Sequence, residues 1–537
     1  MSYKIRSLLL STALFVSLLT FSQSRLSADG VKIERTLQMI KNLYVDDVET
    51  SKLTESAIRA MLRELDPHSS YLDKDEVKAM NEPLQGNFDG IGISFNMITD
   101  TLYVMEVISG GPSQKVGILP GDKIIFVDDS LIAGVKKDNQ EVVKMLRGPK
   151  GTAVNVKVLR RDASQLIDFR IVRDKIPIYS IDAAYMIDQS TGYIRLSRFG
   201  ITSSQEFLEA EKKLKAKGMK NMILDLTGNG GGVLQTASDI VDEFLGAGKL
   251  VVYTEGKNQP RLELKTTASG SFETGRLVVL VDESSASASE IVAGAVQDWD
   301  RGIVVGRRTF GKGLVQRQIP LPDGTMVRLT VARYYTPTGR SIQKPYESGN
   351  IDEYNKDFLN RFEHGEMLHA DSIHFLDSLK HTTLMNARTV YGGGGIMPDL
   401  FVPVDTTSLT TLHRNLIAKG IVNKLAIYEV DNRRTTILDN YPEVESFKKK
   451  YQLPASLITK MKEMAAEDQV EWNDEQYENS VQLIHTQIKA LMSRDLYDPD
   501  AYFVIINEIN DIFKEGLRII EDPVLYEELL HEVPIEK

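Results

Sequence analysis

The chain has 537 residues, 42% hydrophobic and 26% charged, a composition ordinary for a globular protein with about two to four domains. The formal net charge of −11 argues against a nucleic acid as partner. The absence of cysteine excludes disulfides, zinc–thiolate sites and a cysteine nucleophile.

The first residues predict a targeting segment. Lys4 and Arg6 precede the apolar run 8–21, and the stretches 22–24 and 26–28 both offer small residues for cleavage. This order is typical of a secretory signal peptide, and the run is short for a spanning helix, which needs about 20 residues. We therefore expect a signal peptide over 1–28 and an exported protein, periplasmic or associated with the cell envelope. An uncleaved anchor is the alternative.

Residues 29–85 have a helical pattern with charged faces. Thr54 is a predicted N-cap, and the stretch Asp66-Pro67 ends the pattern. The apolar stripe that follows the cap consists of Ala57, Ile58, Met61, Leu62 and Leu65. His68 lies in the proline-containing turn, where a structural role is favoured over a catalytic one.

Residues 86–174 change to short β-runs separated by turn residues. Glycines in such a loop let backbone N–H groups bind a terminal carboxylate, while an added peptide strand pairs with the sheet edge. The loop that resembles the carboxylate-binding loop of a PDZ domain consists of Gly90, Ile91, Gly92 and Ile93. Val142 and Leu146, on a predicted helix, would complete an apolar peptide pocket with the two isoleucines. A spacer domain with a degenerate groove is the alternative.

Residues 175–405 alternate buried strands with helices, the pattern of an α/β domain. The strand 222–226 ends in the glycine-rich loop 227–232, and a helix follows. Such a loop can hold phosphate, but the spacing fits neither the dinucleotide fingerprint nor the P-loop.

Ser287 follows the apolar run 277–281 and begins a helical pattern. Ser287 and Glu290 have the spacing of a capping box, so a helix cap alone would explain the serine. The other interpretation is a nucleophile beside free N–H groups that bind an oxyanion. Lys312 could be its base if burial lowers the lysine pKa from about 10.4. The glycines beside Lys312 would leave room for a substrate backbone, and Gln316 could orient the lysine.

The motifs SASASEIVAGAVQD and GRRTFGKGLVQ, in this order, resemble the carboxyl-terminal processing protease family, also called tail-specific proteases. The resemblance implies a serine endopeptidase with Ser287 as nucleophile, Lys312 as base and Gln316 as helper. It implies an α/β protease core of the ClpP/crotonase-like type with an inserted PDZ-like β domain, an N-terminal helical region and a C-terminal helical domain. No cofactor or metal is expected.

The same resemblance implies the oxyanion donors. They are the backbone N–H groups of Gly231 and Ala288, and Gly232 is an equal candidate for the first. The family usually has an arginine at the position of Thr227, so a local ion pair is in doubt.

Two segments depart from the family pattern. Residues 344–389 predict a helical surface insertion, whose histidines, among them His364, His369 and His374, lack the H-E-x-x-H metal motif. Residues 406–537 predict helices at 477–492, 499–520 and 523–532. They form either a cap on the protease or a surface for a homo-oligomer or an adaptor.

The expected function is therefore cleavage of protein or peptide substrates that have free C-termini. A PDZ-based scaffold with an inactive protease fold is the runner-up, but neither Ser287 nor Lys312 is missing. A third hypothesis is a crotonase-like acyl-CoA enzyme. The PDZ-like segment and the signal peptide argue against it.

Overall fold

The computed structural model describes residues 27–98, 100–160, 163, 165–267 and 270–531. The predicted signal peptide lies outside these residues, apart from its last two. Within the described ranges, no helix is long and apolar enough to cross a membrane.

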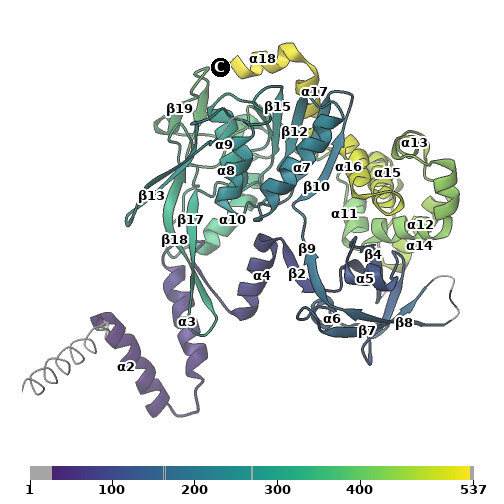
Figure 1. The fold of residues 1–537 in the computed structure, drawn as a ribbon, viewed down its shortest axis with the longest axis horizontal. Helices are drawn as coiled ribbons and strands as arrows, with labels where there is room; N and C mark the ends of the chain where they lie inside the picture. Colours follow the sequence, from purple (N-terminus) through teal and green to yellow (C-terminus); the bar gives the residue numbers. More distant parts are fainter. Residues whose placement is uncertain (1–26, 99, 161–162, 164, 268–269, 532–537) are drawn as a thin grey trace, which may run out of the picture.

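A six-stranded sheet forms the centre of the α/β core (Figure 1). Its strand order is β10 (Ile181–Met186), β11 (Thr191–Leu196), β12 (Asn221–Asp225), β15 (Leu277–Val281), β16 (Ile303–Gly306) and β21 (Leu400–Phe401). The first pair is antiparallel and the others are parallel. Every residue of β12, β15 and β16 is buried, which explains their continuous apolar runs.

Helices cover both faces of this sheet. One face packs against α7 (Ser203–Ala216), α8 (Leu234–Asp242) and α9 (Ala288–Asp298). The other packs against the C-terminal helices α17 (Asp511–Glu521) and α18 (Pro523–His531). Alternate residues of one strand reach opposite layers, as Val278 and Val279 do. The end of the chain therefore completes the core itself.

The helix predicted over 499–520 is wrong as a single element. It divides into α16 (Pro499–Ile506), a 3-10 turn at Asn507–Ile509, and α17. Asn510 Oδ1 accepts the N–H of Phe513 and caps α17, so the chain changes direction there. The apolar periodicity continues through the break and hides it.

The remaining C-terminal helices form a bundle with its own core. They are α11 (Thr411–Ala418), α12 (Ile421–Asn440), α13 (Val444–Lys450), α14 (Ala455–Glu467), α15 (Asp474–Leu496) and α16.

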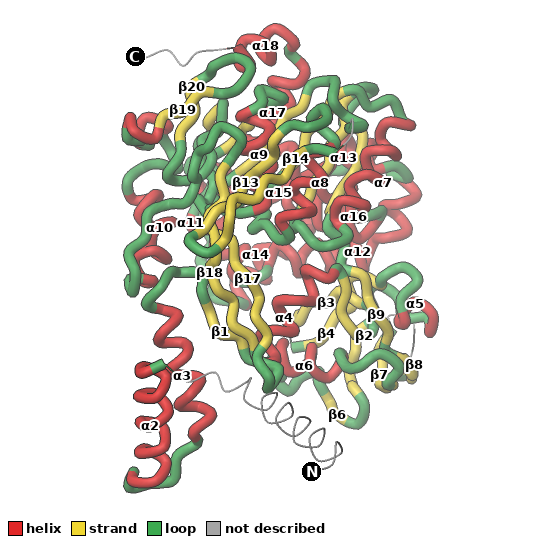
Figure 2. Tube along the Cα trace, turned by 60° about the vertical axis from the view of Figure 1, so that its left-hand side comes forward, coloured by secondary structure: helices red, strands yellow, loops and turns green. Residues whose placement is uncertain are grey.

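A second sheet lies beside the core (Figure 2). Its long strand β18 (Met326–Tyr335) pairs with β17 (Leu314–Pro320), β13 (Leu250–Gly256) and β1 (Ser70–Leu72), and β14 (Gln259–Lys265) pairs with β13. Residues from the N-terminal region thus join a sheet of the core.

The PDZ-like domain is inserted through a two-stranded ribbon, β2 (Asn87–Gly90) against β9 (Asp174–Pro177). Its sheet order is β3 (Ile93–Ile98), β4 (Thr101–Val107), β5 (Lys123–Val127), β7 (Ala153–Leu159) and β8 (Ile167–Val172), with β6 (Ser130–Leu131) on β5. Two helices complete it, α5 (Pro112–Val116) and α6 (Asn139–Leu146). β3 is an edge strand, since it pairs only with β4 in this sheet.

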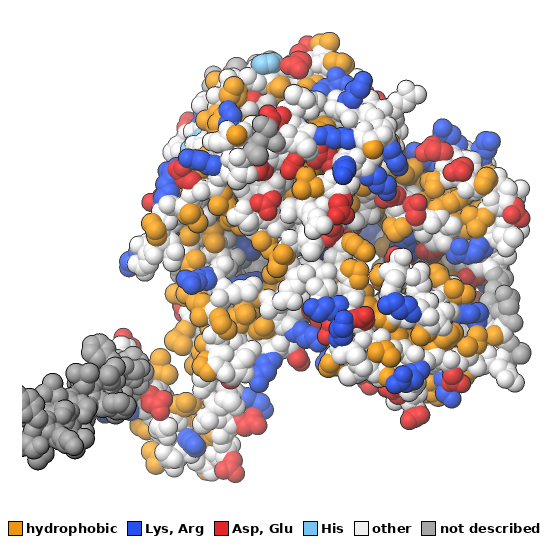
Figure 3. Space-filling model, viewed as in Figure 1, with side chains coloured by type: hydrophobic (Ala, Val, Ile, Leu, Met, Phe, Trp, Pro, Cys, Tyr) orange, Lys and Arg blue, Asp and Glu red, His pale blue; other side chains and the backbone are white. Residues whose placement is uncertain are grey.

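The N-terminal region has α2 (Ala28–Leu43), α3 (Thr50–Arg63) and α4 (Lys74–Gln85), and the first two extend away from the body (Figure 1). The N-cap predicted at Thr54 is wrong, because α3 starts at Thr50 and the Thr54 hydroxyl donates to Thr50 O. Of the predicted stripe only Leu62 is buried, while Met61 and Leu65 are 48% and 50% exposed. Figure 3 shows apolar side chains among charged ones on this arm.

The insertion contains α10 (Ile351–Glu363), 3-10 turns at Ala370–Ser372 and Asp377–Leu379, and the hairpin β19 (Lys380–Thr382) and β20 (Thr389–Tyr391).

Candidate active site

Ser287 lies in the sharp turn between β15 and α9, with φ 56° and ψ −109°. An L-residue seldom adopts this conformation, which costs about 1–3 kcal/mol unless its surroundings hold it. A helix cap normally has an extended backbone, so capping alone gives no reason for the strain. A strained serine between a strand and a helix has the geometry of a nucleophile elbow.

Gly231 lies directly against this turn. A Cβ on Gly231 would be 2.8 Å from Ser287 Cβ and 2.7 Å from Ala286 O, and its φ is 94°. Only glycine fits here. Its N–H, the predicted oxyanion donor, donates in this structure to Asn229 Oδ1 at 2.9 Å.

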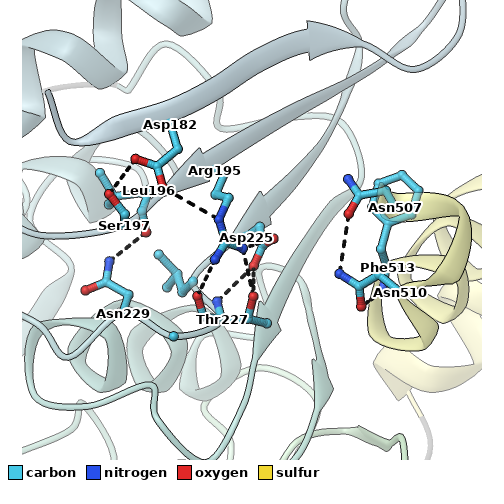
Figure 4. A network of polar contacts seen from close by, with 12 residues as sticks. Asp182, Arg195, Leu196, Ser197, Asp225, Thr227, Asn229, Asn507, Asn510 and Phe513 are labelled. Atoms are coloured by element: carbon cyan, nitrogen blue, oxygen red, sulfur yellow. Dashed lines mark hydrogen bonds and ion pairs between the residues drawn. The ribbon is translucent and has the colours of Figure 1, made fainter. Parts of the chain in front are cut away.

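Asn229 ties the glycine loop to its neighbours. Its side chain is fully buried, and Nδ2 donates to Leu196 O at 2.7 Å (Figure 4). Its carbonyl accepts the Ala286 N–H and the Ser289 hydroxyl. The N–H of Ala288, at the first position of α9, makes no hydrogen bond within the described part of the chain. It is therefore free to bind an anion at the positive end of the helix.

Glu290 connects the turn of Ser287 to the loop of Lys312. Its Oε2 accepts the N–H of Ser287 at 2.7 Å and the N–H of Lys312 at 2.9 Å. Its Oε1 accepts the Gly311 N–H at 2.7 Å and the Thr309 hydroxyl at 2.5 Å. The side chain is fully buried, and burial raises the pKa of Glu290 to about 7. The spacing of the sequence predicted the contact with Ser287 but not the three others.

The pKa of Lys312 is lowered to about 8, first by burial and then by the charge of Arg328. Glu290 and Asp66 oppose this shift. Roughly one lysine in ten is then neutral at pH 7, so deprotonation costs little. The Tyr334 hydroxyl lies within hydrogen-bond distance of the carbonyl oxygens of both Ser287 and Lys312.

The glycines that flank Lys312 contact the chain itself. A Cβ on Gly311 would be 3.1 Å from Gly395 N, and a Cβ on Gly313 would be 2.9 Å from Gln343 N. The Gly313 N–H donates to Gln343 Oε1. The expectation that these glycines leave room for a substrate backbone is therefore wrong, because residues 343 and 395 occupy that space.

The insertion packs on the same loop. Arg361 of α10, only 4% exposed, donates to the carbonyl oxygens of Thr309 and Arg308. The Tyr354 hydroxyl is 2.9 Å from Nε2 of His68. Burial, followed by the charge of Lys312, lowers the pKa of His68 to about 4, so this histidine is neutral at pH 7. α10 is helical and mostly exposed, as expected of a surface insertion, and its two buried side chains, Tyr354 and Arg361, make these contacts.

Gln316 lies on β17 and donates through Nε2 to Leu314 O at 3.2 Å and to Thr330 Oγ1 at 3.3 Å. Over the described residues we find no direct hydrogen bond from Lys312 Nζ to Gln316 or to Ser287 Oγ.

Thr227 stands where the family resemblance implies an arginine, and Arg195 of the neighbouring strand supplies a positive charge there (Figure 4). Its guanidinium donates to Asp225 Oδ2 at 2.6 Å and to Thr227 Oγ1 at 2.9 Å. Asp225 thus does form an ion pair, but its partner is Arg195 of β11 and not the residue at position 227. Short-range patterns do not reveal a contact across two strands.

The predicted peptide-binding loop joins β2 to β3, and Gly92 has φ 76°. Of the side chains expected to form the apolar pocket, Ile91, Val142 and Leu146 are at most 4% exposed and belong to the domain core, so they present almost no surface to a peptide. Of the two isoleucines only Ile93 stays partly exposed, next to the unpaired edge of β3.

Four family models match the chain. They are peptidase family S41 over residues 190–351, the PDZ domain over 90–171, the N-terminal domain of the activating protease CtpB over 19–76, and a family of unknown function over 412–498.

Among curated proteins, the chain is 37% identical over 311 residues to a carboxy-terminal-processing protease of Bartonella bacilliformis, covering 57% of this chain and 70% of the relative. It is 34% identical over 316 residues to the carboxy-terminal processing protease CtpB of Bacillus subtilis, covering 58% of this chain and 65% of the relative. A solved photosystem II D1 C-terminal processing protease is 27% identical, with a TM-score of 0.34, covering 59% of this chain and 91% of that one.

Replacing Glu290 by glutamine should weaken the connection between the turn of Ser287 and the loop of Lys312. A glutamine has one acceptor oxygen, so its NH2 group would face two of the four donors. We expect a loss of about 2–5 kcal/mol in the free energy of unfolding of the core at pH 8. The chain has two tryptophans, Trp299 in the core and Trp472 in the C-terminal bundle. Urea unfolding followed by Trp299 fluorescence in a Trp472→Phe background measures the effect.

The control is Glu209→Gln, an exposed carboxylate on α7, which should unfold like the parent protein. A Glu290→Gln protein of parental stability would show that the four contacts do not hold the site together.

Proposed function

The chain belongs to the carboxy-terminal processing protease family of S41 serine peptidases, and from this premise we propose that it is an exported endopeptidase that recognises C-terminal tails and cleaves peptide bonds with a Ser–Lys dyad. The observation that carries the proposal is the Glu290 carboxylate, which binds the backbone N–H of both Ser287 and Lys312.

In the proposed reaction, neutral Lys312 removes the proton from Ser287 Oγ as the oxygen attacks the peptide carbonyl. The C–N bond then breaks, and the lysine gives the proton to the leaving amine. The acyl-enzyme is hydrolysed by water, with Lys312 again taking and returning a proton. A lysine pKa near 8 supports both roles, because the group gains and loses a proton near neutral pH.

The oxyanion would be stabilised by backbone donors. The N–H of Ala288 at the start of α9, which has no hydrogen-bond partner among the described residues, supports its role as one donor. Gly231 would be the second, exchanging Asn229 Oδ1 for the oxyanion. Gln316 would accept a hydrogen bond from the Lys312 ammonium and orient it.

Substrate recognition would use the PDZ-like domain. A C-terminal strand would add to the free edge of β3, with its carboxylate at the loop 90–93. Export is inferred from the basic residues and apolar run of the first 21 residues, and the periplasm or cell envelope is the proposed location.

The catalytic assignment predicts a specific pH profile. Because only neutral Lys312 accepts the proton, kcat/KM for an unstructured polypeptide should rise with pH through about 8. Ser287→Ala should fold normally and lose at least about a thousandfold in kcat. Lys312→Arg, which keeps the charge but cannot deprotonate, should be equally inactive. Substantial cleavage by Lys312→Arg would identify another base and contradict the dyad.

The recognition assignment predicts a requirement for a free carboxylate. Calorimetry of the full-length Ser287→Ala protein with one peptide as the acid and as the amide isolates this group. The amide should bind at least about tenfold more weakly, since it loses hydrogen bonds to a charged group. If both forms bind with the same affinity, the loop 90–93 does not bind the C-terminus.

A further inference from the structure

The segment 66–69 belongs to the core rather than to the helical region in which it was predicted. The adjoining strand β1 pairs with β18, with Ser70 opposite Arg328 and Leu72 opposite Met326. This pairing carries Asp66 and Ser69 into the core, where they are 5% and 6% exposed. The proposed catalytic reaction does not use them.

Asp66 accepts four hydrogen bonds. Its Oδ1 accepts the N–H of His68 at 2.8 Å, the N–H of Ser69 at 3.0 Å and the hydroxyl of Thr330 at 2.9 Å. Its Oδ2 accepts the hydroxyl of Ser69 at 2.5 Å. The Thr330 hydroxyl has one proton, which it donates to Asp66 Oδ1. Thr330 Oγ1 can therefore take part in further hydrogen bonds only as an acceptor.

Gln316 donates to that oxygen, at 3.3 Å, and to Leu314 O, at 3.2 Å. A carbonyl oxygen only accepts, so the amide group facing Leu314 must be the NH2. A register shift between Val315 and Gln316 places Gln316 opposite Thr330. Bulges of this kind redirect side chains next to active sites. With its NH2 held on two acceptors, Gln316 keeps its carbonyl oxygen for another partner.

We propose that Asp66 and Thr330 are positioning residues that hold the Gln316 amide with its oxygen available to the Lys312 ammonium. In this chain of hydrogen bonds, the Gln316 NH2 donates to Thr330 Oγ1, and the Thr330 hydroxyl donates to Asp66 Oδ1. The segment 66–69 is thus part of the catalytic apparatus, although it touches no reacting atom. The inference rests on the proposed function, since it assigns supports to the helper of the same dyad.

Asp66 acts on Lys312 through charge as well. The groups whose charges act on Lys312 are Arg328 of β18, Glu290 of α9, Asp66, and His68, which is neutral at pH 7. Arg328 lowers the pKa of Lys312, whereas Asp66 and Glu290 raise it. Loss of the Asp66 charge alone should therefore lower the lysine pKa.

Two substitutions distinguish the positioning role of the Thr330 hydroxyl from the effect of the Asp66 charge. Thr330→Val keeps the side-chain shape and removes the hydroxyl, which frees the amide of Gln316. Asp66→Asn keeps an oxygen for the Thr330 hydroxyl, while its NH2 takes the place of Oδ2 and donates to the Ser69 hydroxyl, which also accepts the Thr330 N–H. Thr330→Ser restores the hydroxyl. The control is Thr336→Val, a buried threonine just after β18 whose hydroxyl has one hydrogen-bond partner among the described residues, the Thr338 hydroxyl at 3.4 Å.

The experiment measures kcat and KM against pH for the full-length protein. We expect Thr330→Val to lose about 10- to 100-fold in kcat with KM within about twofold, and Thr330→Ser to recover most of it. Asp66→Asn should move the half-maximal pH down, because it removes the charge that raises the pKa of Lys312. Thr336→Val should match the wild type.

A wild-type kcat in Thr330→Val, or a loss that Thr330→Ser does not repair, would overturn the positioning role. An unmoved or raised half-maximal pH in Asp66→Asn would overturn the role of its charge. Failure of the proposed function itself would give a different result. In that case the wild type would not cleave the substrate, or Ser287→Ala would cleave it as fast as the wild type.

Discussion

The Glu290 carboxylate, fully buried between α9 and the loop 309–312, is the interaction on which the site depends. Burying a carboxylate is costly, and here four donors offset part of that cost, since the pKa of Glu290 is still raised to about 7. Because its Oε2 accepts the N–H groups of both Ser287 and Lys312, one side chain sets their relative position. The Tyr334 hydroxyl connects the same two residues a second time, because it lies within hydrogen-bond distance of both of their carbonyl oxygens. The strained turn at Ser287 persists because these contacts and the close approach of Gly231 hold it.

Segments from far apart in the chain converge on this centre. The N-terminal region brings Asp66 to Thr330, 264 residues away, and the insertion brings Arg361 to the carbonyl of Thr309. The C-terminal helix α17 packs on the opposite face of β15, the strand that leads to Ser287. The PDZ-like domain is attached by the β2–β9 ribbon, beside α4 of the same N-terminal region. The N-terminal region, the insertion and α17 thus contact residues that support Ser287 and Lys312.

Local patterns predicted much of this arrangement. The buried strands β12 and β15, the start of α9 and the contact of Glu290 with Ser287 follow from apolar runs and capping spacing, which are short-range signals. Contacts between distant segments leave no such signal, so the ion pair from Arg195 to Asp225 and the hydroxyl relay through Thr330 could not be predicted. The break at Asn510 was missed because apolar periodicity continues across it. Ile91 was assigned to a pocket because an apolar residue suits a groove and a core equally well.

The most direct test of the dyad is covalent labelling by a peptide phosphonate, which reacts with an activated serine without needing turnover. The adduct is located by mass spectrometry of the digested protein, and the labelling rate is measured between about pH 6 and 10. The account predicts an adduct at Ser287 whose rate of formation rises through about pH 8, following the deprotonation of Lys312. An adduct at another residue, or a rate at Ser287 that does not change with pH, would contradict the assignment of Ser287 and Lys312.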